Sequence, residues 1–113
     1  MPSGNTNIMK EFNDTFNDIK ESFHDSFHVK SDDESIHKFA SNCGGKYEIE
    51  QQIDYQNNDL LKCEKFVNDL NLVLRTNQLK KDLKYKEYIQ KVDSYMKEYR
   101  EAINKLSELS KYA

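Results

Sequence analysis

The chain has 113 residues, of which 36% are hydrophobic and 33% are charged, with three Gly, one Pro and a net charge of −3. The length is that of one domain, and the shortage of glycine favours long helices over an α/β fold, which needs glycine-rich turns. The small negative charge argues against nucleic-acid binding, because such proteins carry a clustered cationic surface.

Membrane spanning and secretion are also disfavoured. No apolar run approaches the ~20 residues that cross a bilayer, and the first residues, MPSGNTNIMK, lack the apolar core of a signal peptide. Cys43 and Cys63 form no CxxC pair, so we expect two free thiols in a reducing compartment. These features predict a soluble, cytoplasmic chain.

The first predicted element is an amphipathic helix over residues 8–29, after a polar leader at 1–7 that we expect to be disordered. Its apolar residues recur at steps of three and four, which places them within about 100° of arc on one helix face. They are Ile8, Phe12, Phe16, Ile19, Phe23 and Phe27. We expect this face to dock on other helices.

A lipid surface is the alternative destination for this face, since phenylalanine-rich amphipathic helices can lie in a membrane interface. The polar side of the helix carries five acidic residues between positions 11 and 25 and only two lysines. Interfacial helices usually carry Lys or Arg there, because the cytoplasmic leaflet is anionic. Protein docking is therefore the preferred interpretation.

Residues 30–45 are predicted to form a linker that contains one short helix. The acidic run before Ile36 offers Ser31, Asp32 or Asp33 as an N-cap. Gly44 and Gly45 follow, and they can provide the left-handed conformation in which many helices end.

Residues 46–113 contain neither Gly nor Pro and carry two heptad seams, which predicts a coiled-coil region. The seams are eleven residues apart, from Leu74 to Tyr85, a spacing that fits a stutter in one long helix or a bend near 75–82. A second stripe contains Leu61, Leu72, Leu79 and Leu83 on the opposite side. A helix that is apolar on two sides packs against several neighbours.

The predicted fold is all-α and elongated rather than globular, with interfaces to other small coiled-coil proteins as the functional surface. The expected partner-interface residues are Phe12, Phe16, Ile19, Phe23, Phe27, Leu60, Val67, Leu70, Leu74, Leu79, Leu83, Ile89, Val92, Met96, Ile103 and Leu106. We expect no catalytic, cofactor or metal site. His24 and His28 have the i, i+4 spacing of metal ligands, but no third ligand accompanies them.

Several short motifs resemble the fungal BLOC-1 interactor family, small subunits of the biogenesis of lysosome-related organelles complex. They are Glu21-Ser22-Phe23, the run Ser35-Ile36-x-x-Phe39-x-Ser41, and Ile49 with Ile53 at the start of the next helix. The resemblance implies a non-enzymatic coiled-coil subunit of a hetero-oligomeric, endosome-associated complex for cargo sorting and trafficking. A lipid-binding peripheral protein, or a subunit of a kinetochore or tethering complex, remains the alternative.

Overall fold

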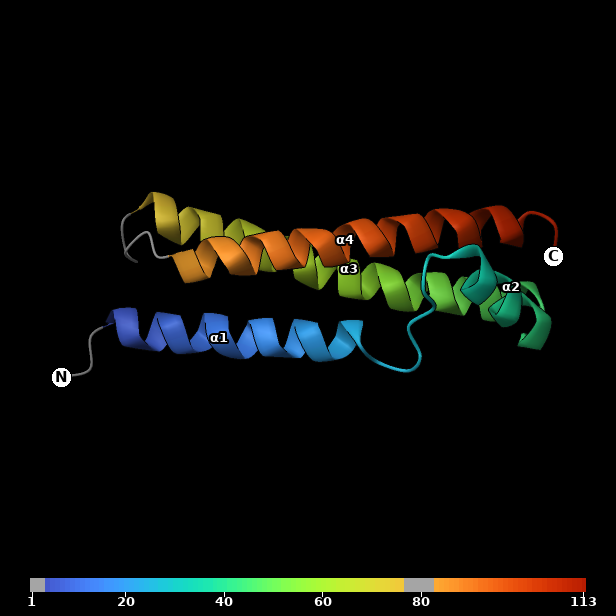
Figure 1. The fold of residues 1–113 in the computed structure, drawn as a ribbon, viewed down its shortest axis with the longest axis horizontal. Coiled ribbons are helices and arrows are strands. Elements are labelled where there is room, and N and C mark those ends of the chain that lie inside the picture. Colours follow the sequence, from blue (N-terminus) through green and yellow to red (C-terminus); the bar gives the residue numbers. More distant parts are fainter. Residues whose placement is uncertain (1–3, 77–82) are drawn as a thin grey trace.

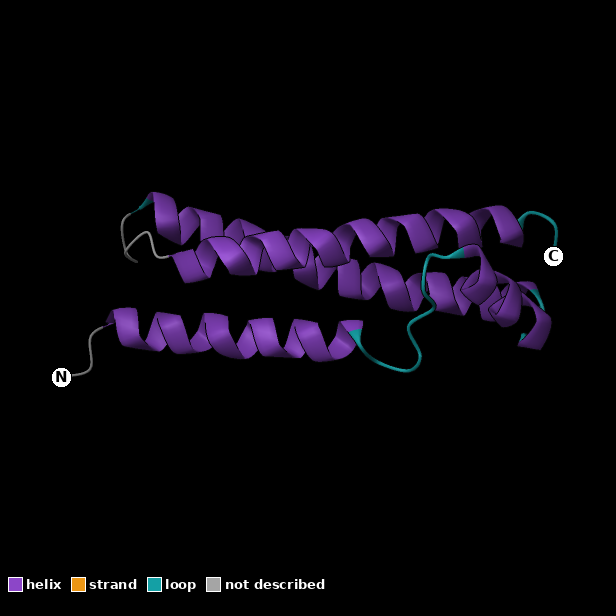
Figure 2. Ribbon diagram, in the orientation of Figure 1, coloured by secondary structure: helices purple, strands orange, loops and turns teal. Residues whose placement is uncertain are grey.

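The computed structural model describes residues 4–76 and 83–113, with side chains from Ile8 to Thr76 and from Lys84 onward. All the regular elements in those ranges are helices (Figure 2), which confirms the all-α class. They are α1 (Gly4–Phe23), α2 (Asp33–Asn42), α3 (Lys46–Arg75) and α4 (Leu83–Ser110). The molecule is elongated as predicted, with principal extents of 57 × 21 × 18 Å (Figure 1).

Helix α1 differs from the predicted range at both ends, since it covers 4–23 rather than 8–29. Residues 4–7 of the predicted leader are thus helical, and residues 1–3 lie outside the described part of the chain. The helix ends early because its last carbonyl, Phe23 O, accepts hydrogen bonds from His28 Nδ1 at 3.0 Å and Lys30 Nζ at 3.5 Å. The backbone N–H of Phe27 also donates to Asp25 Oδ1 at 2.8 Å, a local turn that competes with the helix.

The linker contains the predicted short helix, α2, and Asp32 is its N-cap. The Asp32 carboxylate accepts from the backbone N–H of Ser35 at 2.9 Å and from its hydroxyl at 2.8 Å. The predicted glycine termination of α2 is wrong. Its C-cap is Cys43 in an extended conformation, and Gly45, with φ of 132°, is instead the residue that precedes α3.

Helices α3 and α4 form a helical hairpin rather than one continuous helix. Helix α3 ends at Arg75, and α4 begins at Leu83 and runs back beside α3 (Figure 1). Residues 77–82, where the sequence indicates a stutter or bend, lie outside the described residues. The hairpin forms because each of the two heptad seams provides the other with an apolar surface to bury.

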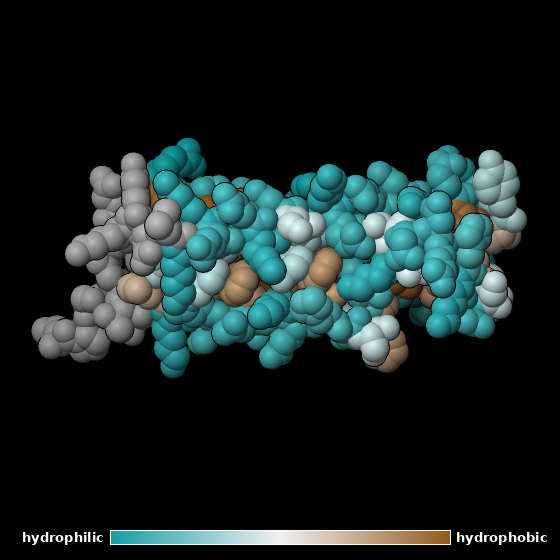
Figure 3. Space-filling model, viewed as in Figure 1, coloured by the Kyte–Doolittle hydropathy of each residue, from teal (hydrophilic) through white to brown (hydrophobic). Residues whose placement is uncertain are grey.

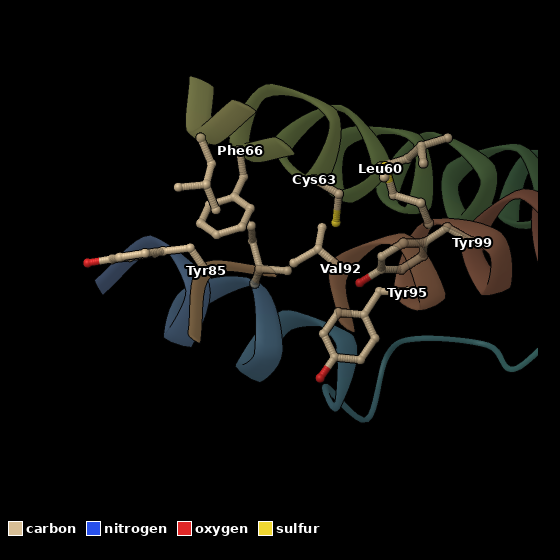
Figure 4. Close-up of a cluster of buried hydrophobic side chains, with 10 residues drawn as sticks. Leu60, Cys63, Phe66, Tyr85, Val92, Tyr95 and Tyr99 are labelled. Carbon is tan, nitrogen blue, oxygen red and sulfur yellow. The ribbon is translucent and has the colours of Figure 1, made fainter. Parts of the chain in front are cut away.

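The main core lies between α3 and α4 and is closed on one side by α1. Figure 4 shows Leu60, Cys63 and Phe66 of α3 facing Val92 and Tyr99 of α4. Each of these side chains is buried. Part of the core that the sequence assigned to partner helices is therefore supplied by the chain itself.

A second, smaller core joins the linker to the other end of the hairpin. Ile36 of α2, Ile49 of α3 and Leu106 of α4 are buried together. The linker is also fixed by polar contacts, because Ser31 N donates to Glu98 Oε1 at 2.9 Å and Lys105 Nζ donates to Ser31 O at 2.6 Å.

Candidate interaction surfaces

The aromatic face of α1 packs on the hairpin. The ring of Phe12 meets Phe66 of α3 edge to face, with centroids 5.9 Å apart. The ring of Phe23 stacks on Tyr95 of α4, with centroids 4.1 Å apart. Such aromatic pairs add about 0.5–1.5 kcal/mol each beyond the area that they bury. The N-terminal helix thus docks on its own chain.

Most of the predicted interface residues contribute to the core of the chain. Ile19, Leu60, Leu70, Val92, Met96 and Leu106 are buried, and Phe12, Phe16, Phe23, Val67, Leu74, Ile89 and Ile103 are partly buried and packed against the core. The placement of Phe27 on the face of α1 is wrong, because this residue lies beyond the end of α1 and is 73% exposed. Leu79 lies outside the described residues, and the side chain of Leu83 does as well.

The expected interface residues omit core residues on the same helices. Phe66 of α3 and Tyr95 of α4 are among them, and both are buried. Phe66 lies three residues after Cys63 and four before Leu70, and Tyr95 lies three after Val92, so the helical spacing contained the signal. A seam of two residues per heptad is too narrow here, because α3 and α4 also pack against α1.

Polar residues are also buried where the linker crosses the hairpin, among them Gln56 and His28. Gln56 occupies a seam position of α3, and its Nε2 donates to the backbone oxygen of Val29 at 3.1 Å. His28 packs against the ring of Tyr99, with centroids 4.8 Å apart. Burial lowers the pKa of His28, and the neighbouring cation Lys30 adds to the effect. Gln56 therefore holds the linker against α3 through its hydrogen bond to Val29.

A groove of about 570 Å³ lies between α1 and α3. Ile19, Cys63 and Phe66 contribute apolar surface to its lining, and charged residues of both helices line it as well. Asp59 is also part of the lining, although it is only 6% exposed. Burial raises the pKa of the Asp59 carboxyl against the opposing effect of Lys62. The groove thus combines an apolar surface with a poorly solvated carboxyl group.

The side of α3 that faces away from the core carries exposed leucines. Leu61 is 61% exposed and Leu72 is 55% exposed. They are about 160° and 180° around the helix from Cys63. Figure 3 shows that the surface on the α1 and α4 side is mostly hydrophilic, with small hydrophobic areas between these helices. Leu61 and Leu72 therefore lie on the same outward side of α3, about three helical turns apart, with the exposed Lys65 and Asn68 between them.

The histidines and cysteines of the described residues are also candidates for a site. They include no group of three or more side chains that could hold a metal ion. His28 is buried and lies outside α1, so His24 and His28 do not share a helix face. Cys43 and Cys63 are both free. None of the described helices is long and apolar enough to span a bilayer.

Comparisons of this chain with models of protein families, with curated proteins and with solved structures found no match.

Proposed function

We propose that this protein is a non-enzymatic helical subunit of a hetero-oligomeric complex, and that its α3 helix binds a helix of a neighbouring subunit. The observation that carries the proposal is the outward pair Leu61 and Leu72. Both leucines remain exposed after the chain has formed its own core. A partner helix that covers them removes this apolar surface from water.

The resemblance to the fungal BLOC-1 interactors supports a more specific form of the proposal. In that form, the chain belongs to an endosome-associated complex of small coiled-coil proteins that takes part in cargo sorting. The elongated helical fold suits such an assembly, because subunits can align along its length.

The lipid-binding alternative receives less support from the packing of α1. Phe12, Phe16 and Phe23 contact the rings of Phe66, Tyr88 and Tyr95 within the chain. Insertion of these side chains into a bilayer requires α1 to leave the hairpin, and the aromatic contacts with α3 and α4 are then lost.

The test is quantitative co-purification from the cell of origin with the protein tagged at its native level. The variant carries Leu61→Glu and Leu72→Glu, and the control carries Asn104→Glu, which adds a charge at an exposed position of α4. We expect the double variant to recover at least ten times less of its partner proteins than the control recovers. Both variants should have the same thermal unfolding midpoint.

Unchanged recovery of every partner by the folded double variant would show that the proposal is wrong. The identity of the lost partners tests the more specific form. Subunits of an endosomal coiled-coil complex support the BLOC-1-like assignment, whereas kinetochore or tethering subunits contradict it.

A further inference from the structure

The groove between α1 and α3 contains two buried polar groups without partners. Asp59 is 6% exposed and Tyr99 is 0% exposed, and both residues line the groove. Asp59 Oδ2 and the Tyr99 hydroxyl have no hydrogen-bond partner among the described residues. An unpaired buried polar group destabilises the folded chain, so a ligand that supplies a hydrogen-bond donor to it is favoured.

The α1 side of the groove is acidic. Glu11, Asp14 and Asp18 line it at steps of three and four, so they lie on one side of the helix. On the α3 side, Lys65 is paired with Asp69 at 2.8 Å. Lys62 is the other lysine among the lining residues. The charge of the lining therefore favours a cationic occupant.

The length of the groove favours a helix as that occupant. Its lining extends along α1 from Glu11 to Ser22, a rise of about 16 Å or three helical turns. The apolar part of the lining includes Phe12, which is only partly buried and so leaves apolar surface for an amphipathic helix to cover.

We propose that this groove binds a basic amphipathic helix of a partner subunit. The apolar residues of that helix lie on the accessible part of Phe12, and a Lys or Arg side chain donates to Asp59. Other Lys or Arg residues, at steps of three and four, face Glu11, Asp14 and Asp18. This inference rests on the proposed function as a complex subunit, but it assigns a second surface with its own charge specificity.

The experiment is an NMR titration of the full-length ¹⁵N-labelled chain with a 14-residue amphipathic peptide of Leu and Lys. The matched control peptide has Glu at every Lys position. We expect the Lys peptide to shift the amide signals of residues 11–22 and 59–69, and the Glu peptide to leave them in place. Asp59→Asn should weaken binding at least tenfold, whereas Asp93→Asn, at an exposed position of α4, should leave it unchanged.

Three outcomes would overturn the inference: no shift with the Lys peptide, shifts outside the groove, or equal weakening by Asp59→Asn and Asp93→Asn. A triple variant, Glu11→Gln with Asp14→Asn and Asp18→Asn, provides a second test that leaves the buried carboxyl intact. This variant should also bind the Lys peptide more weakly. Unchanged binding would contradict the role of Glu11, Asp14 and Asp18. Failure here does not affect the proposal for Leu61 and Leu72, because that surface is tested separately by co-purification.

Discussion

The rings of Phe16 and Tyr88 are stacked, with centroids 4.2 Å apart and an angle of 14° between their planes. This contact joins α1 to α4 across 72 positions of the sequence. The hydroxyl of Tyr88 also donates to Asn13 Oδ1, one turn earlier on α1. The N-terminal helix is thus held on the hairpin by stacking and by a polar contact beside it.

Replacing Phe16 by alanine should therefore destabilise the protein. We expect the free energy of unfolding to fall by about 2–3 kcal/mol, less than for a fully buried Phe, because this ring is only partly buried. Phe27→Ala is the matched control, since Phe27 is exposed, and it should change the value by less than about 0.5 kcal/mol. Urea titration followed by circular dichroism measures both. Equal effects of the two variants would mean that α1 does not dock as described.

Two leucines of α3 should differ in how much they contribute to the stability of the fold. Leu70 is fully buried, so Leu70→Ala should lower the free energy of unfolding by about 2–5 kcal/mol. Leu72 faces outward, so Leu72→Ala should change it by less than about 0.5 kcal/mol. Thermal or urea unfolding of the isolated variants gives both values. A large loss for Leu72→Ala would mean that this side chain has a structural role within the chain.

The two thiols should differ in reactivity. Cys63 is buried, and this burial is the main reason that the pKa of its thiol is raised to about 12. Cys43 is partly exposed. Because the thiolate is the reactive form, iodoacetamide at neutral pH should label Cys43 first and Cys63 only after unfolding. Mass spectrometry of the Cys43→Ser and Cys63→Ser variants, with and without urea, measures the two rates. Similar native rates at both positions would contradict the buried placement of Cys63.

The burial of His28 predicts a loss of stability in mild acid. Its pKa is lowered from 6.5 in the folded state. As pH falls through 6.5, the unfolded chain takes up a proton that the folded chain does not bind, so the free energy of unfolding decreases. Asp59 acts in the opposite sense, because its raised pKa costs stability as pH rises from 3.8.

The contribution of His28 is isolated by comparing His28→Gln with the unmodified chain in urea titrations between pH 5 and 8. The variant should lose less stability than the unmodified chain as pH falls below 6.5. His37→Gln, at an exposed position, should follow the unmodified chain. Identical pH profiles for all three proteins would show that His28 does not contribute to the acid sensitivity.

The ends of the helices illustrate where local sequence signals suffice. The residue types before Ile36 limit the N-cap of α2 to Ser31, Asp32 or Asp33, because capping is a local property, and the contact with Ser35 N selects Asp32. The end of α1 is different, since it depends on His28 and Lys30 folding back to Phe23 O. The apolar spacing continues through Phe27, so it does not predict that contact.

The helical class, the apolar faces of the helices and the elongated form are predictable from the sequence alone. They follow from the 3.6-residue period and from the lack of Gly and Pro after Gly45. Which apolar faces meet depends on the packing of the folded chain, because periodicity defines a face but not its partner. This packing places the heptad seams and the phenylalanines of α1 in one core and leaves Leu61 and Leu72 exposed. It also brings Asp59 of α3 and Tyr99 of α4 into one groove, since that juxtaposition depends on the reversal of the chain between the two helices.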